Sequence, residues 1–388
     1  MEIRKLTAED YEAHQHIASL AFGRGAPPTF TTEIYDQPDR QRIGIYENGR
    51  LQASLGILDF EFYFGKDRRP CGGIFGVASD PAMRGKGFAG TLVKHSLGIM
   101  RDKGQFLSSL WPFDFRYYRR YGWEAAAEAR WYTAPLELLP HSKETEHVEG
   151  VYENVVPVIA PIYERKAVQY NGMLARSAKR WEQKTASGGN RRQSAYIYRR
   201  DGMAEGYALI KYGEKEDELE ATELVALTAR AYLGLSGVAR RHAMTVKKLK
   251  WWGPANDFFP SLIAHWDIET KVEPSGMNRV VDVRAALSAL KPDQGLRGEA
   301  LVGISDEYAP WNSGVWRIAI EDGSVEASLT NRDPGVLMDI QAFSQAYWGT
   351  PSLLDLRRWD RIEVREEVDY TLLDSLLPPT PVWLYDDF

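Results

Sequence analysis

Apolar and polar residues follow different rhythms along the first part of the chain. Residues 42–64 alternate between apolar and polar around Asn48-Gly49, a dipeptide typical of tight hairpins, which predicts two antiparallel strands. CGGIFGVAS, residues 71–79, predicts a third strand. From Phe88 to Met100 apolar residues recur at helical spacing, which predicts a helix. The glycine-rich stretch RGKGFAG, residues 84–90, is therefore expected as a loop between a strand and a helix.

The same order of elements is expected to recur after residue 145. Before residue 145 the pattern also predicts a strand at 2–5 and a capped helix to about Phe22. After the helix that starts at Phe88 it predicts a strand at 105–111, a short helix at 113–121 and a closing strand at 123–134. The later pattern predicts a helix at 156–169, hairpins at Asp201-Gly202 and Asp322-Gly323, a strand at 218–227, helices at 228–242 and 334–349, and an edge strand at 246–252.

The chain is long enough for more than one domain, because its 388 residues exceed the usual size of about 100 to 200 residues per domain. We expect domains at residues 1–145, 146–280 and 281–388. The middle region echoes the first in its order of elements, but nothing in it matches RGKGFAG. It is expected to have a similar fold without that loop.

Composition narrows the class of protein. Apolar residues make up 44% and charged residues 26%, and no run of about 18 apolar residues offers a membrane span. The start of the chain lacks a secretory pattern, so we expect a cytoplasmic protein. The single cysteine, Cys71, excludes an internal disulfide framework and a cysteine-rich metal site. A net charge of -6 argues against nucleic-acid binding. His14 and His16 would point apart on a helix, so no metal site is expected.

RGKGFAG is typical of loops that bind phosphate, because amides at a helix N-terminus and the helix dipole attract anions. A Walker loop is excluded because Lys86 is followed by glycine rather than serine or threonine. Gly85-x-Gly87-x-x-Gly90 does have the spacing of a dinucleotide fingerprint, but an antiparallel hairpin precedes it rather than a βαβ unit. An oxidoreductase therefore remains a weaker alternative.

The loop, with the strand and the turn DPAM before it, resembles the pyrophosphate loop of the GNAT acyl-CoA N-acyltransferases. The resemblance implies acetyl-CoA as cosubstrate and assigns Val77, Ala78 and Ser79 to its pantetheine arm. It also implies that the phosphates are held by Arg84, Gly85, Lys86, Gly87, Phe88, Ala89 and Gly90.

A tyrosine cluster, FRYYRRYGW at residues 115–123, continues the resemblance. GNAT domains commonly carry a tyrosine four residues before a glycine-aromatic pair, and Tyr118 with Gly122-Trp123 has that spacing. A phenol with an ordinary pKa near 10 is protonated at neutral pH and can give its proton to the CoA thiolate, so Tyr118 is the expected general acid. Phe113 and Asp114 are expected beside the CoA arm.

The three-part plan resembles the Eis family of N-acetyltransferases. This implies an α+β fold class: tandem GNAT-like domains, the second degenerate, followed by a domain like sterol carrier protein. It also implies a hexamer, no metal, and a catalytic role for the α-carboxylate of the last residue, Phe388. With Asp386 and Asp387 this carboxylate would attract a cationic amine, either aminoglycoside-like or lysine-like. Weaker candidates for the substrate pocket are Phe22, Phe30, Tyr35 and Asp36.

The sequence thus predicts an acetyl-CoA-dependent N-acetyltransferase that acts on small cationic amines by direct transfer. The alternative from another class is a binding protein that holds CoA, or a lipid in its third domain, without transferring an acetyl group.

Overall fold

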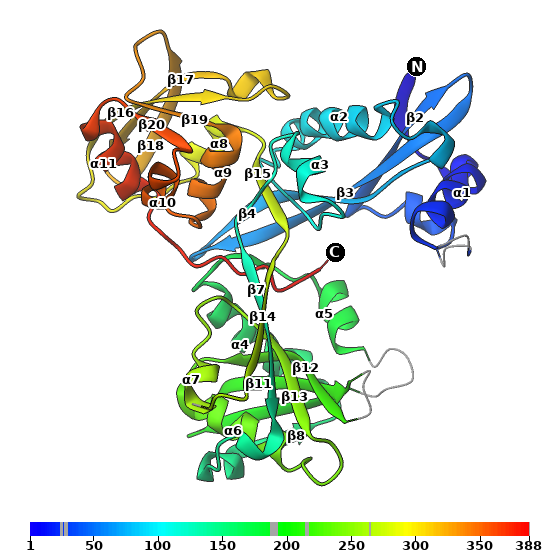
Figure 1. Ribbon diagram of the computed structural model, residues 1–388, viewed down its shortest axis with the longest axis vertical. Coiled ribbons are helices and arrows are strands. Elements are labelled where there is room, and N and C mark those ends of the chain that lie inside the picture. The colour runs from blue at the N-terminus through cyan, green and yellow to red at the C-terminus, as the bar shows by residue number, and fades with distance from the viewer. Residues whose placement is uncertain (24–25, 27–29, 187–192, 214–216, 264, 388) are drawn as a thin grey trace.

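Three β-sheets organise the chain, which we describe from a computed structural model. The structure describes residues 1–388 except 24–25, 27–29, 187–192, 214–216, 264 and 388. Figure 1 shows the first and third sheets side by side at one end of the molecule and the second sheet at the other. Among the described residues, no helix has the length and apolarity needed to cross a membrane.

The first sheet has the order β1-β2-β3-β4-β5-β15-β6, and β9 pairs with β3. The predicted hairpin is confirmed, because Asn48 and Gly49 adopt the positive φ angles of a tight turn between β2 and β3. The strands are β1 (Glu2–Lys5), β2 (Arg40–Glu47), β3 (Arg50–Phe64), β4 (Asp67–Ser79), β5 (Leu107–Leu110), β6 (Glu124–Ala125), β9 (Asn171–Leu174) and β15 (Met277–Val280). The helices with it are α1 (Tyr11–Phe22), α2 (Phe88–Asp102) and α3 (Phe115–Arg119).

The second sheet has the order β14-β7-β13-β12-β11-β10-β8. Its strands are β7 (Glu128–Pro135), β8 (Val148–Val151), β10 (Ser194–Arg200), β11 (Met203–Tyr212), β12 (Glu218–Ala226), β13 (Lys248–Gly253) and β14 (Glu269–Pro274). Its helices are α4 (Val156–Ala167), α5 (Ala178–Thr185), α6 (Ala229–Arg240) and α7 (Phe259–Ile263). The expectation of an edge strand at 246–252 is wrong: β13 lies between β12 and β7, and Trp251 is fully buried, which the lysines beside it conceal in the sequence.

The third sheet has the order β18-β17-β16-β19-β20. Its strands are β16 (Gly298–Ser305), β17 (Gly314–Glu321), β18 (Ser324–Thr330), β19 (Val336–Asp339) and β20 (Ile362–Val364). Its helices are α8 (Val283–Ser288), α9 (Ile340–Trp348), α10 (Leu353–Arg358) and α11 (Glu367–Leu376). The helix expected at 334–349 begins later than predicted, because β19 comes first and Asp339 caps α9 by accepting a hydrogen bond from the amide of Ala342.

The second sheet is inserted into the first. The expected closing strand at 123–134 divides into β6 and β7, which belong to different sheets. It divides because Ala126 and Ala127 are both buried, and two successive inward residues break the alternation of a strand. The chain returns to the first sheet at β15, which pairs with both β5 and β6. The second sheet therefore starts before residue 145, the predicted border of the first domain. Strand β15 comes before residue 280, the predicted end of the second domain, but it belongs to the first sheet.

Candidate active site

The first sheet opens where β4 and β5 part. The two strands pair in parallel from Cys71 with Leu107 to Ile74 with Leu110, and no pair follows among the described residues. On its other side β4 remains paired with β3. After a register shift, Ala78 pairs with Ser54 and Ser79 pairs with Ala53. The structure therefore places Val77, Ala78 and Ser79 on a strand whose second edge is open.

The loop at residues 84–90 ends at the N-terminus of α2. Gly85 and Gly87 have φ angles of 83° and 85°, which favour glycine, and a Cβ on either would meet open space. Within the described part of the chain, the amides of Gly87, Phe88, Ala89 and Gly90 have no hydrogen-bond acceptor. Arg84 and Lys86 are exposed and have no carboxylate partner there. Free amides and unpaired cations fit a phosphate group.

Gly90 serves packing rather than backbone conformation. A Cβ at this position would lie 2.1 Å from the hydroxyl oxygen of Tyr121. The first turn of α2 thus rests directly on the tyrosine cluster. The two motifs, RGKGFAG and FRYYRRYGW, form one packed unit.

Tyr118 projects from α3 beside the loop. Asp114 caps this helix, since its Oδ1 accepts hydrogen bonds from the amides of Arg116 and Tyr117 at 2.7 and 3.3 Å. Phe113 is exposed, and its ring lies 5.5 Å from that of Tyr118. Tyr118 is buried, and burial, assisted by Tyr117, raises the pKa of its phenol. The raised pKa keeps this hydroxyl protonated at neutral pH, so it has a proton to donate.

A buried ion pair packs against the residues that follow α3. Gly122 has a φ of 91°, and a Cβ there would lie 1.4 Å from Nη1 of Arg279. This nitrogen donates to the carbonyl of Tyr121 at 2.6 Å, while Nη2 pairs with Asp306 of the third domain at 2.6 Å. Sequence reasoning missed Arg279 and Asp306, because nothing near Gly122 indicates which distant segment fills the space that it leaves.

Comparison with known proteins agrees with this geometry. Residues 2–126 and 172–284 each match the family described as Acetyltransferase (GNAT) domain, and residues 283–385 match the Sterol carrier protein domain. An uncharacterized N-acetyltransferase of Streptomyces avermitilis is 23% identical over 93% of both chains. A probable N-acyltransferase of Enterococcus faecalis has a TM-score of 0.88, with 25% identity over 98% of both chains. Eis1 from Mycobacterium abscessus has a TM-score of 0.81, with 20% identity over 100% of both chains.

The chain has an Eis-like GNAT acetyltransferase fold. The two GNAT domains and the sterol carrier protein domain that follows them confirm the predicted fold class. The GNAT domains and the N-acetyltransferase relatives also confirm the prediction of an acyltransferase. GNAT domains use acetyl-CoA as cosubstrate, and the open β4 edge and the free amides of the loop are compatible with such a molecule.

The chain end of this Eis-like protein docks on the second GNAT domain. Phe388 lies outside the described residues. Asp386 is buried, and its carboxylate lies 3.0 Å from Nε of Arg176, 3.3 Å from Nε of Arg180 and 3.6 Å from Nζ of Lys184. The expectation that Asp386 adds negative charge around the acceptor is therefore wrong, because three cations neutralise it. The Asp387 side chain is 83% exposed and keeps its charge near solvent.

On the face opposite α2, a small pocket lies between the first sheet and α5. Its volume is about 220 Å³, and its charged lining residues are Asp39, Arg40, Asp59, Glu61, Lys179 and Arg180. Asp39 pairs with Arg40, and Asp59 with Lys103. Glu61 is the one acid of the pocket without an ion pair in the described part of the chain. Nearby on this face, the guanidinium of Arg42 lies 5.0 Å from the ring centre of Phe75.

The weaker candidates for the substrate pocket do not converge. Tyr35 is buried and its hydroxyl lies 2.9 Å from Nδ1 of His14, while the ring of Phe30 stacks on the same histidine. Phe22 and Asp36 are exposed. Tyr35 and Phe30 therefore pack with α1.

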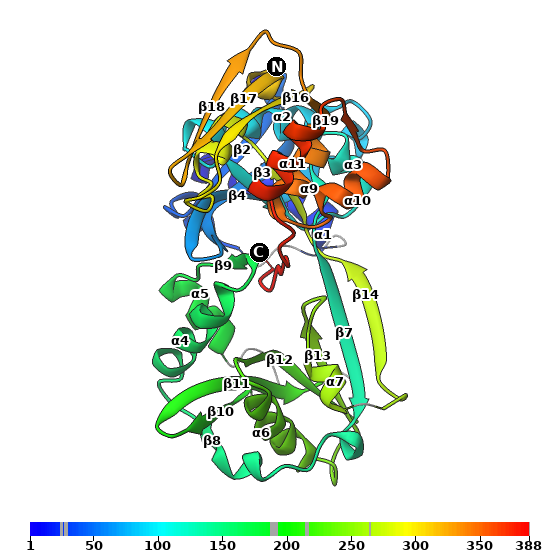
Figure 2. The same cartoon turned by 90° about the vertical axis from the view of Figure 1, so that its left-hand side faces the viewer.

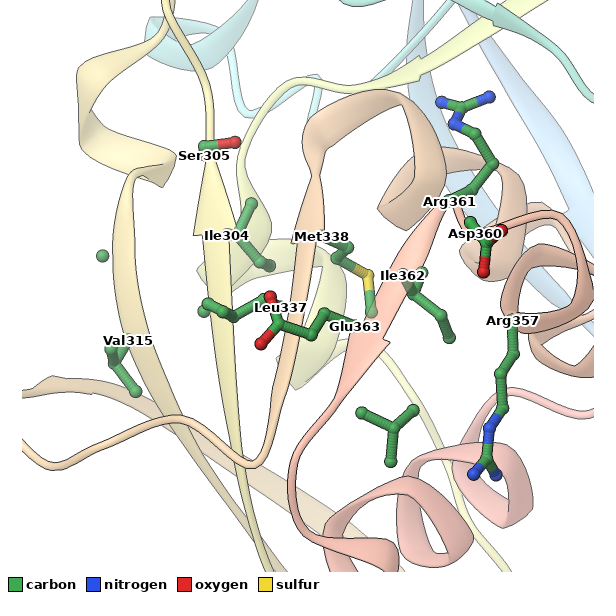
Figure 3. A pocket seen from close by; sticks show the side chains of 13 residues that line it. Ile304, Ser305, Val315, Leu337, Met338, Arg357, Asp360, Arg361, Ile362 and Glu363 are labelled. Carbon is green, nitrogen blue, oxygen red and sulfur yellow. The ribbon is translucent and has the colours of Figure 1, made fainter.

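The sterol carrier protein domain has a hollow of its own, with a volume of about 880 Å³ (Figure 3). Apolar side chains of the sheet line it, among them Val315, Leu337 and Met338. Charged side chains of residues 357–363 stand around it. Arg357 is paired with Glu367, Arg361 with Asp339 and Glu363 with Arg365, whereas Asp360 has no ion pair among the described residues. These charges make the hollow a poor match for a wholly apolar ligand.

Proposed function

We propose that this protein is an acetyl-CoA-dependent N-acetyltransferase that transfers the acetyl group directly to a primary amine. The observation that carries the proposal is the open edge of β4, together with the free amides of the loop that follows it and the buried phenol of Tyr118 on α3. Bound acetyl-CoA supplies the thioester carbonyl that the amine attacks, so a C–N bond forms and the C–S bond breaks.

The chain's own groups divide between binding and proton transfer. The side chains of Arg84 and Lys86 and the amides of Gly85 and of Gly87 through Gly90 bind the pyrophosphate, and residues 77–79 hold the pantetheine arm. The amide of Lys86 does not take part, because it donates to the carbonyl of Met83. Phe113 and Asp114 flank that arm, Asp114 by capping α3. Tyr118 donates its proton to the sulfur that leaves, and solvent restores it. The α-carboxylate of Phe388 accepts the proton that the amine nitrogen loses.

The acceptor is proposed to be cationic, either aminoglycoside-like or lysine-like. Glu61 in the pocket beside α5 supports this, because no cation of the described residues forms an ion pair with it. Asp387 is paired with Arg180 and Lys184, but its side chain is 83% exposed and open to solvent. Figure 2 shows the C-terminal end of the described chain and α5 between the two GNAT domains; Glu61 lines the pocket with residues of α5, and Asp387 is paired with Arg180 of that helix.

The test is release of CoA thiol from acetyl-CoA across a panel of amines: an aminoglycoside, a polyamine, a lysine peptide, and an amine of equal size that carries a carboxylate. We expect turnover with the first three and little with the last. Preference for the carboxylate-bearing amine would contradict the cationic acceptor, and no turnover with any amine would favour the binding protein.

We further propose a homo-hexamer and a cytoplasmic location. The resemblance to the Eis family supports the hexamer, and a free buried thiol at Cys71 is compatible with a reducing compartment. Light scattering should give a particle of six chains of 44.0 kDa. A monomeric mass would contradict the assembly without affecting the proposed reaction.

A further inference from the structure

The two GNAT domains open at the same point of their sheets. In the first, the parallel pairs of β4 and β5 end at Ile74 with Leu110, and in the second those of β12 and β13 end at Ala221 with Trp251. The antiparallel neighbour shifts register close to this point in both sheets, and a helix follows in both, α2 and α6. The second domain therefore has a groove of its own where the first is open.

Residues of the two grooves can be compared by their distance in sequence from the last parallel pair of each sheet. Val77 comes three residues after Ile74, and Leu224 comes three residues after Ala221. Trp111 and Trp252 each follow the last paired residue of their strand, and their ring centroids lie 6.1 Å apart. The openings of the two grooves are thus adjacent across the interface of the domains.

A side chain from the end of the protein occupies the second groove. The amide of Leu224 donates a hydrogen bond to the hydroxyl of Tyr385 at 2.9 Å. The Tyr385 side chain is fully buried, with ring centroids of Trp383 and Trp252 at 4.2 and 5.8 Å. The corresponding residue of the first domain is Val77 by this count and Ser79 by pairing after the register shift, and we assign both to the pantetheine arm. In the second domain a tyrosine of the same chain takes that place.

Backbone and charge fix the segment on either side of Tyr385. Asn171 donates its amide to the carbonyl of Pro381 at 3.0 Å and accepts from the amide of Trp383 at 2.9 Å. Arg176 lies between the carboxylates of Asp386 and Glu223, and the side chains of all three are at most 1% exposed. Glu223 is on β12, directly before Leu224. The ion pairs of Arg176 therefore lie next to the groove that Tyr385 fills.

We propose that the second GNAT domain is a binding site for the chain's own C-terminal segment, residues 381–387, which occupies its degenerate coenzyme groove. Coenzyme and segment cannot share that groove, so the chain binds one acetyl-CoA. Beyond the buried Asp386 two residues remain, Asp387 and Phe388, and they span up to about 7 Å, which is the reach with which the segment presents the chain end to the first domain's opening beside the Trp252–Trp111 contact. This delivery rests on the proposed function, and Tyr385 and Arg176 are its positioning residues.

Three variants of the full chain test the proposal. Tyr385→Phe keeps the ring but removes the acceptor of the Leu224 amide, and Arg176→Met removes the cation between Asp386 and Glu223. Glu182→Gln is the control, because Glu182 is exposed on α5, does not line the pocket beside that helix and makes no ion pair among the described residues. Arg176→Lys tests whether the charge alone restores the wild-type behaviour.

Hydrogen exchange of a peptide covering residues 381–388 reports docking whether or not the enzyme is active. We expect faster exchange in Tyr385→Phe and Arg176→Met, with peptides of the loop at 84–90 unchanged and Glu182→Gln like wild type. Unchanged exchange in the segment would overturn the proposal. If Arg176→Met fails to fold, Tyr385→Phe decides the outcome.

Two further readouts separate this proposal from the proposed function. Calorimetry should give one acetyl-CoA per chain, and two per chain would overturn the proposal. In the docking variants kcat should fall at least about tenfold with the KM for acetyl-CoA unchanged, and Arg176→Lys should recover part of it. Wild-type protein that binds acetyl-CoA but transfers nothing would contradict the proposed function and the delivery, while the exchange data would still decide whether the groove is a docking site.

Discussion

The guanidinium of Arg279 occupies the space beside Gly122 in which any other residue would place its Cβ. The contact joins the last turn of the tyrosine cluster to β15, which the chain reaches only after completing the second domain. Because Arg279 is also paired with Asp306, it cannot move aside without leaving a buried carboxylate unpaired.

Gly122→Ala should therefore destabilise the protein by about 2–4 kcal/mol, through both the clash and the positive φ. Gly98→Ala is the control: it lies in α2, where a Cβ would meet no neighbour, and it should stabilise by about 0.5–1 kcal/mol. Urea denaturation measures both. Equal effects of the two substitutions would show that Arg279 does not constrain Gly122.

Tyr118→Phe should lower kcat roughly 10²-fold while the KM for acetyl-CoA stays unchanged, because the ring still packs and only the proton donor is lost. Tyr117→Phe is the matched control on the same helix, and its kcat should remain close to wild type. Steady-state kinetics with a good amine substrate measures both. A Tyr118→Phe enzyme with normal kcat would remove this hydroxyl from the mechanism.

Replacing Arg84 and Lys86 together by glutamine should raise the KM for acetyl-CoA about tenfold, since each charge-assisted hydrogen bond contributes about 1.5–3 kcal/mol and solvent screens exposed groups. The effect should shrink at high salt, where wild-type affinity falls as well. Lys66→Gln, in the exposed turn between β3 and β4, is the control for lost charge. An equal rise in that control would exclude a specific role for the loop cations.

Stability should depend on pH through His14. Burial, with a contribution from Arg42, lowers the pKa of His14 from 6.5 to about 4. The unfolded chain therefore binds a proton more readily than the folded chain between these values, so stability is complete above about 6.5 and is lost as the pH falls toward 4, by up to about 3 kcal/mol. Urea denaturation at pH 7 and pH 5 measures the change. His14→Gln should weaken this dependence, and the exposed His16→Gln should not; equal behaviour would assign it to other groups.

Much of the local structure could be predicted from the sequence, because it depends on neighbours in the chain. The hairpin at Asn48-Gly49 and the helix that begins at Phe88 follow from turn chemistry and apolar spacing. The division into β6 and β7 was harder to predict, because the sequence of residues 124–134, EAAAEARWYTA, is compatible with one continuous strand. Only the structure shows that Ala126 and Ala127 are both buried. Lys248 and Lys250 concealed a central strand: they lie on its more exposed face, Lys248 paired with Glu269 and Lys250 over the ring of Trp131, while Trp251 is buried on the other face.

The candidate site was predictable in part for the same reason. The loop and Tyr118 lie within about 35 residues of each other and carry their own signals, and whether they act as expected stays a prediction. Arg279, Asp306 and Arg176 carry no signal, because each acquires its role from a partner far away in the chain. Asp386 shows the converse: acidic and close to the end, it was expected near a substrate, but three cations from the second domain enclose it.

The insertion of the second sheet between β6 and β15 limits how this protein can be shortened. A chain stopped at residue 145 would keep the loop and the tyrosine cluster, yet it would lack the strand that separates β5 from β6 and the arginine beneath Gly122. Gene fragments that end at the apparent border of the first domain should therefore yield aggregating protein, with β5 exposed as a bare edge. A minimal version would have to rejoin the chain at Met277, beside the point where it leaves.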